Sequence, residues 1–218
     1  MSATTTDPGE LLEVFDAKGR ATGRAKRRDV IHREGLWHLA FFCWIVTSAG
    51  EVVLQRRAAD KDVWPGRFDA SAAGHVRFGE TIAQAAREID EELGLDVDFA
   101  ALVPVMRHRQ EHRHESGLVD RELHDVFLLR CDRPLEDYRP GPEVSGLTAV
   151  PLRALLALGQ RTALEIPTTL VTFDAAGHAL RSAIVLHRED LVPYDVGYLG
   201  ALAMAAAALP QPTSSSVR

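Results

Sequence analysis

The residues best suited to chemistry in this chain lie between Gly74 and Leu95, where a glycine-rich loop runs into a segment with closely spaced carboxylates. Residues three and four apart share one face of an α-helix, so Glu88, Glu91 and Glu92 would project together. The apolar residues of the segment fall on the opposite face. This pattern predicts a helix that packs on one side and binds a ligand on the other, and its apolar stripe consists of Ile82, Ala85, Ala86, Ile89 and Leu93.

Carboxylates at these spacings repel one another by roughly 0.2–0.5 kcal/mol per pair, and Arg87 offsets only part of that cost. A divalent cation would offset the rest. Hard oxygen ligands suit Mg²⁺ or Mn²⁺, which complete their coordination with water and phosphate oxygens. We therefore expect Glu88, Glu91 and Glu92 to bind metal at a diphosphate site. The alternative, from the charges alone, is a solvated acidic helix face.

The stretch resembles the Nudix box, which reads Gly, five residues, Glu, seven residues, Arg-Glu, an aliphatic, any residue, Glu-Glu, any residue, Gly, and an aliphatic. In this sequence the pattern starts at Gly74 and Glu80, resumes at Arg87, and ends at Leu95. Only six residues separate Glu80 from Arg87. One residue turns a helix by about 100°, so the gap leaves the orientation of Glu80 relative to the acidic face open.

The resemblance extends over about residues 10–158 and is especially close to isopentenyl-diphosphate isomerases and the Nudix hydrolases related to them. It implies that Arg57 and Lys61 bind diphosphate. In those isomerases, three histidines and two carboxylates bind a divalent metal. The implied second metal set here is His32, His38, His75, Asp120 and Glu122. Such mixed donors suit Mn²⁺, Fe²⁺ or Zn²⁺ better than Mg²⁺. The alternative is ordinary surface histidines and basic residues.

Two departures from the isomerase pattern favour hydrolysis. Those isomerases carry a proton-transferring cysteine where this chain has Ala73, and they commonly carry an arginine at the position of Glu88. The resemblance thus implies a hydrolase of phosphorus-containing anhydrides, with Glu91 and Glu92 as catalytic residues and a metal-bound water as nucleophile. Glu143 is a further candidate acid. The alternatives are an isomerase-like enzyme and a non-catalytic nucleotide-binding regulator.

Composition and charge limit the function classes. With 31 acidic and 25 basic side chains in 218 residues, the net charge is −6, so a nucleic-acid-binding surface would have to be local, and we expect no nucleic-acid partner. The small-molecule diphosphate substrate is what the resemblance implies. No apolar run is long enough to span a bilayer and no targeting segment is evident, which indicates a cytoplasmic protein. Cys43 and Cys131 lie in apolar runs and are expected to be buried, reduced thiols.

The order of predicted elements is strands, helix, strands, helix, which fits an α+β fold with a mixed sheet flanked by helices. The resemblance makes this the α/β/α sandwich of Nudix proteins. We expect a Nudix domain over residues 10–160, with residues 108–114 as a polar loop. Residues 161–209 form a C-terminal extension that packs on the domain or builds a homodimer interface, without chemistry of its own. Residues 1–9 and 210–218 are expected to be disordered tails.

Overall fold

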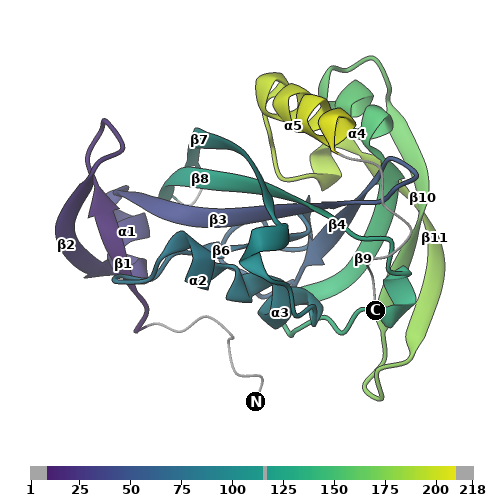
Figure 1. Ribbon diagram of the computed structural model, residues 1–218, viewed down its shortest axis with the longest axis horizontal. Helices are drawn as coiled ribbons and strands as arrows, with labels where there is room; N and C mark the ends of the chain where they lie inside the picture. The colour runs from purple at the N-terminus through teal and green to yellow at the C-terminus, as the bar shows by residue number, and fades with distance from the viewer. Residues whose placement is uncertain (1–8, 115–116, 210–218) are drawn as a thin grey trace.

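A computed structural model describes residues 9–114 and 117–209, so the predicted tails fall almost wholly outside the described residues. Within that range a mixed sheet lies between two groups of helices, as the sequence predicted. Figure 1 shows α4 and α5 on one side of the sheet and α2 and α3 on the other. The helices are α1 (Arg28–Glu34), α2 (Ile82–Ala85), α3 (Arg87–Leu93), α4 (Leu152–Gly159) and α5 (Val196–Ala208).

The sheet runs in the order β11-β10-β9-β4-β3-β1-β2, with β5 against β4, β6 and β8 against β3, and β7 against β8. Of these pairs, β3 and β8 run parallel, whereas the other pairs of strands are antiparallel. The strands are β1 (Leu11–Phe15), β2 (Ala21–Arg27), β3 (Trp37–Val46), β4 (Glu51–Arg57), β5 (Phe68–Asp69), β6 (Ala72–His75), β7 (Val103–Arg113), β8 (Val119–Arg130), β9 (Val144–Pro151), β10 (Glu165–Phe173) and β11 (Ala179–His187).

The apolar strand β3 divides the core into two halves, because successive side chains of a strand point to opposite faces of the sheet. Phe42 and Trp44 belong to the half beneath α4 and α5. Phe41 and Cys43 belong to the half that contains Ile89 and Leu93 of α3. The sequence of residues 38–47, which is apolar at both odd and even positions, predicts a strand buried on both faces, and β3 confirms it. Cys43 is buried, whereas Cys131 is only half-buried, against expectation.

The residue missing from the box is absorbed by a break in the helix. The segment forms two short helices, α2 and α3, which meet at Ala86. Thr81 caps α2 in a capping box with Gln84, which fixes where the first helix begins. The predicted apolar stripe survives this break, since Ala85, Ala86, Ile89 and Leu93 are buried.

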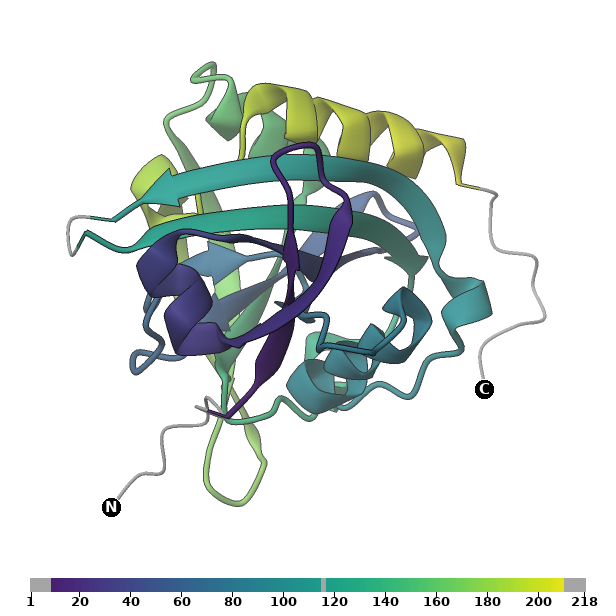
Figure 2. The same ribbon diagram turned by 90° about the vertical axis from the view of Figure 1, so that its left-hand side faces the viewer.

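The second half of the chain differs from the sequence prediction in one element. Residues 108–113 belong to the long strand β7 and are not a loop, because they pair with β8 in register, His108 opposite His124 and His112 opposite Asp120. The alternating burial along β7 is that of a strand with one face covered. Figure 2 shows α5 lying over the β7–β8 hairpin.

Residues 161–209 continue the same sheet and core. The β10–β11 hairpin adds two strands beside β9, and α5 packs against α4. The indole N–H of Trp44 on β3 donates a hydrogen bond to the hydroxyl of Tyr198 on α5, at 2.9 Å. No helix in the described ranges is long and apolar enough to cross a membrane.

Candidate functional site

Four elements of the fold bring the predicted histidine and carboxylate set together. His38 lies on β3 directly opposite Glu122 on β8, and His75 ends β6, the other neighbour of β3. His32 comes from α1, which contacts β8. The ring centroids of the three histidines are 4.9 to 5.4 Å apart. Parallel pairing of β3 with β8 therefore places groups from distant parts of the sequence in one cluster.

The donor atoms of this cluster fit a divalent metal. Among the described residues, two sets have all their ligand atoms within 4.8 Å of one another, and they are His32-His38-His75 and His38-Asp120-Glu122. The Nε2 atoms of His32 and His38 and the Oδ1 atom of Asp120 are buried without a hydrogen-bond partner. Buried polar atoms normally have a partner, so these atoms are available as ligands.

Hydrogen bonds around the cluster orient its donors. His38 Nδ1 lies 3.1 Å from the Leu36 carbonyl, which can only accept, so Nε2 keeps its lone pair for a metal. His124 Nε2 is 2.8 Å from Glu122 Oε2 and positions that carboxylate. The His124 ring in turn stacks on Phe42 at 3.9 Å. Such outer contacts fix the direction of metal ligands.

Burial and mutual charge set the protonation of the cluster. Burial, with the nearby His75 and His38, lowers the pKa of His32 to about 2, so this imidazole is neutral. Burial and the Glu122 charge raise the pKa of Asp120 to about 6. Burial also opposes the charge on His75, but hydrogen bonds to Glu10 and Glu122 outweigh it and raise the pKa of His75 to about 9. His32 is therefore in the neutral form that binds metals, whereas His75 has to release a proton when a metal binds.

Glu92 is the most firmly held glutamate of the acidic helix α3. Its side chain is 3% exposed, and Oε2 accepts hydrogen bonds from Gln55 Nε2 and from the Ala73 N–H, both at 2.8 Å. Burial, followed by the charge of Glu88, raises the pKa of Glu92 to about 8. A cation at this position would stabilise the ionised form.

Glu88 packs against the backbone of β6 at Gly74. A Cβ atom on Gly74 would collide with the Glu88 carboxylate, so the glycine of the box provides the space that this side chain occupies. Glu88 also forms a salt bridge with Arg87. Burial raises the pKa of Glu88 to about 6, although the Arg87 charge opposes the shift.

The other members of the box are held by Arg87. Glu91 is half exposed and accepts from Arg87 Nη1 at 3.0 Å. Arg87 Nε donates to Glu80 at 2.8 Å, so Glu80 still reaches the box despite the missing residue. Glu88, Glu91 and Glu92 do not form one of the tight ligand sets among the described residues, unlike the histidine cluster.

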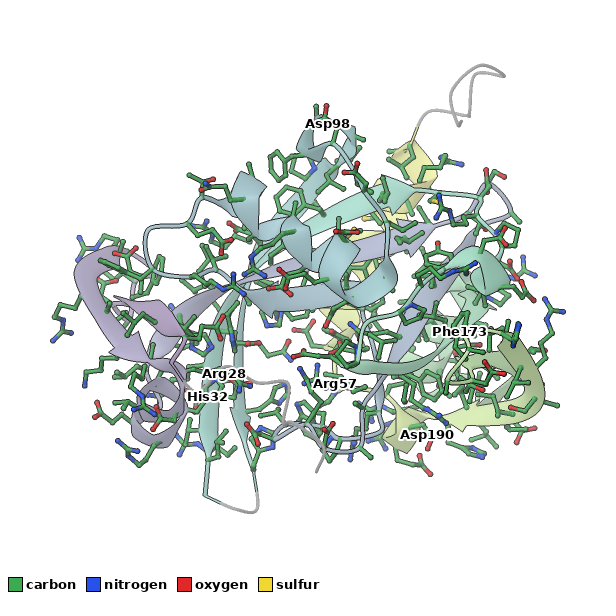
Figure 3. All side chains as sticks on the ribbon, turned by 90° about the horizontal axis from the view of Figure 1, so that it is seen from below. Arg28, His32, Arg57, Asp98, Phe173 and Asp190 are labelled. Atoms are coloured by element: carbon green, nitrogen blue, oxygen red, sulfur yellow. The ribbon has the colours of Figure 1, made fainter. Side chains whose placement is uncertain are left out.

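The three glutamates of α3 line one pocket of about 300 Å³, together with Arg57 and Lys61. The histidine set also lines this pocket, except for His38, which lies behind its wall with an exposed fraction of 0%. Figure 3 places Arg28 and His32 on the α1 side of the molecule and Arg57 nearer its centre. Arg57 donates to Asp69 Oδ2 at 3.0 Å, and Lys61 pairs with Glu143. The pocket therefore combines carboxylates that suit a cation with basic groups that suit phosphate oxygens.

Trp64, Asp69 and Tyr194 are among the residues of this pocket that sequence reasoning missed. Trp64 lines it with a left-handed backbone (φ 51°), Asp69 follows in β5, and Tyr194 reaches it from the C-terminal stretch. Tyr194 belongs to residues 161–209, for which the sequence indicates no chemistry, and it reaches the wall of the pocket. The tyrosine lies more than a hundred residues from Asp69, its partner, and no local pattern signals such a contact.

In this sandwich fold, a carboxylate-bearing helix, a histidine cluster and basic side chains meet at one pocket. This combination is typical of enzymes that act on phosphorus-containing anhydrides. A family model described as the NUDIX domain matches residues 36–168, and the chain belongs to this family.

Individual relatives agree with this assignment. An uncharacterized Nudix hydrolase of Clostridium acetobutylicum is 31% identical over 87% of this chain and 93% of its own length. An isopentenyl-diphosphate Delta-isomerase of Mycolicibacterium vanbaalenii is 33% identical over 79% of this chain and 96% of its own length. A crystal structure from Deinococcus radiodurans shares the fold, with 22% identity, a TM-score of 0.53, and 79% and 93% of the two chains covered.

Proposed function

We propose that this protein is a Nudix hydrolase that cleaves a diphosphate linkage in a nucleotide-type or prenyl-type substrate, with Mg²⁺ or Mn²⁺ as cofactor. The observation that carries the proposal is the meeting of Glu88, Glu91 and Glu92 with Arg57 and Lys61 in one pocket. Carboxylates attract the cation, and the basic groups attract the phosphate oxygens.

The residues divide the work as follows. A divalent cation held by Glu88, Glu91 and Glu92 would neutralise phosphate oxygens and lower the pKa of a bound water. Gln55 and the Ala73 N–H hold the Glu92 carboxyl group in one orientation. Glu91 and Glu92 are the groups we assign to accept the proton of the attacking water. Arg57 and Lys61 orient the substrate diphosphate.

The second metal set supports a rival function. His32, His38 and His75 converge with Asp120 and Glu122, as the resemblance to isomerases implies. Ala73 argues against isomerisation, because its methyl group carries no exchangeable proton and its N–H is already bonded to Glu92. We infer that the histidine set binds a second cation, such as Mn²⁺, in a hydrolase.

A panel of diphosphates, assayed for both phosphate release and isomerisation with Mg²⁺ and with Mn²⁺, tests the proposal. Phosphate release here means inorganic phosphate or diphosphate from terminal di- and triphosphates, and the two phosphate monoesters from nucleotide sugars and dinucleotides. The panel contains nucleoside diphosphates and triphosphates, nucleotide sugars, dinucleotides and isopentenyl diphosphate. We expect metal-dependent phosphate release from at least one substrate and no isomerised product. Isomerisation of isopentenyl diphosphate would contradict the proposal. Nucleotide binding without turnover in excess metal, by folded protein, would instead indicate a regulator.

A further inference from the structure

Asp69 is a buried carboxylate in the wall of the pocket. Its hydrogen bonds within the described residues go to groups other than the candidate metal ligands. Its side chain is 4% exposed. Oδ2 accepts from Arg57 Nη1 at 3.0 Å, and Oδ1 accepts from the Ala70 N–H at 2.8 Å and from the Tyr194 hydroxyl. A buried carboxylate is stable only when its oxygens are bonded in this way. Asp69 therefore links a strand residue of the pocket to a residue of the C-terminal segment.

Arg57 is fixed by two hydrogen bonds at the wall of the pocket. Its Nε donates to the Val63 carbonyl at 3.1 Å, while Nη1 donates to Asp69. Burial disfavours the charge, but Asp69 and Glu92, with a smaller contribution from Tyr194, together more than offset it, so the pKa of Arg57 lies above its usual value. A guanidinium has five N–H donors in a rigid plane, and these two contacts set the direction of the others.

Tyr194 is itself held in place by the aromatic residues beside it. Its ring stacks on Tyr198 with centroids 4.6 Å apart and meets the edge of Trp44 at 5.2 Å. Burial raises the pKa of Tyr194 well above its usual value, so the hydroxyl keeps its proton and donates to Asp69. The contact comes from beyond residue 168, where the match to the family model ends.

We propose that Tyr194 is a positioning residue that holds Asp69 so that Arg57 presents its guanidinium to the substrate diphosphate. The segment between β11 and α5 thereby completes the diphosphate site. The proposal rests on the proposed function, because it assigns Arg57 to the diphosphate. Without the hydroxyl, Asp69 loses one of its bonds and the Arg57 plane is free to tilt. Because Arg57 holds the diphosphate before the reaction and during it, we expect a change in substrate binding rather than in the chemical step.

Tyr198 provides a matched control, because it lies four residues away and its hydroxyl bonds to Trp44 instead of Asp69. We compare Tyr194→Phe with Tyr198→Phe, so that each variant loses one buried hydroxyl. Binding of inorganic diphosphate to the Mg²⁺-loaded full chain is measured by calorimetry. The KM and kcat are measured on the best substrate of the panel.

We expect Tyr194→Phe to weaken diphosphate binding and to raise KM by about tenfold, while kcat changes less than about twofold. A tenfold loss of affinity is the size expected when one hydrogen bond to a charged group is removed. Tyr198→Phe should leave both constants unchanged. In an Arg57→Ala background, Tyr194→Phe should add no further loss, since it acts through Arg57.

Three results would overturn the inference: unchanged diphosphate binding in Tyr194→Phe, equal losses in both phenylalanine variants, or additive losses with Arg57→Ala. Failure of wild-type protein to bind inorganic diphosphate would overturn it as well. The calorimetry needs no turnover, so it separates this inference from the proposed hydrolysis. A protein that binds diphosphate through Tyr194 and Arg57 but releases no phosphate would sink only the proposed function.

Discussion

At the residue scale, Gly74 shows how the absence of one atom shapes the site. The Glu88 carboxylate occupies the space that a Cβ would fill. We predict that Gly74→Ala displaces Glu88 and lowers kcat/KM by roughly 10²-fold, the cost of moving a catalytic group by about 1 Å. Steady-state kinetics with saturating Mg²⁺ measure this effect.

Gly200→Ala is the control for the same substitution elsewhere. Nothing lies within 4 Å of a Cβ at Gly200, and alanine favours the helix α5 in which it lies. Its activity should equal that of wild type. Full activity in Gly74→Ala would show that the position of Glu88 does not matter.

His38 is the residue shared by both sets of candidate ligands, so it tests the second metal site. We predict that His38→Ala lowers the affinity for Mn²⁺ by more than about tenfold, since removal of a ligand costs at least as much as removal of its supporting contact. Isothermal titration of metal-free protein with Mn²⁺ measures it. His178→Ala, which removes an exposed histidine, should titrate as wild type does. Equal affinity in all three proteins would contradict a metal at this cluster.

The sequence predicted candidate site residues only where a spacing signal or a resemblance marked them, as it did for Glu92 and His38. Asp69 and Tyr194 were not predicted, because their contact joins residues far apart in the chain and depends on the packing of the C-terminal segment. Glu91 illustrates a finer limit. Helical spacing places Glu91 on the same face as Glu88, but it does not predict that the Glu91 side chain is half exposed.

At the element scale, the packing of α5 makes residues 161–209 part of the core. Leu202 is fully buried in the half of the core beneath α4 and α5. We predict that Leu202→Ala lowers the free energy of unfolding by about 2–5 kcal/mol, as for other buried leucines. Chemical denaturation of the full chain measures the change.

Met204 lies on the same helix and is 77% exposed, so Met204→Ala should change stability by less than about 0.5 kcal/mol. An equally small effect for Leu202→Ala would mean that α5 does not pack on the domain.

Helices and strands were predictable from the sequence where the apolar residues follow a clear pattern. The apolar run of β3 indicated a strand buried on both faces, and β3 does divide the two halves of the core. The break at Ala86 was not predictable, because the helical spacing of apolar residues continues across it from Ile82 to Leu93. Residues 108–113 are polar enough for a loop, yet pairing with β8 makes them a strand. Tertiary pairing overrides local polarity in such strands.

At the scale of the whole molecule, the parallel pairing of β3 with β8 organises the site. It brings His38 opposite Glu122. Strand β6, which also pairs with β3, carries His75 and holds Glu92 through the Ala73 N–H. Strand β6 thus connects the two candidate metal groups, and members of both groups line one pocket. The central claim is that this arrangement hydrolyses a diphosphate by means of the α3 glutamates.

The most direct test is the rate of phosphate release by Glu92→Gln beside wild type, on the best substrate of the panel with saturating Mg²⁺. Glutamine keeps the size of the side chain and removes its charge, so the fold should remain intact by circular dichroism. We predict a fall in kcat of about 10²-fold or more, the usual cost of losing a group that binds the metal or accepts the proton. A folded Glu92→Gln protein that releases phosphate at the wild-type rate would contradict the account.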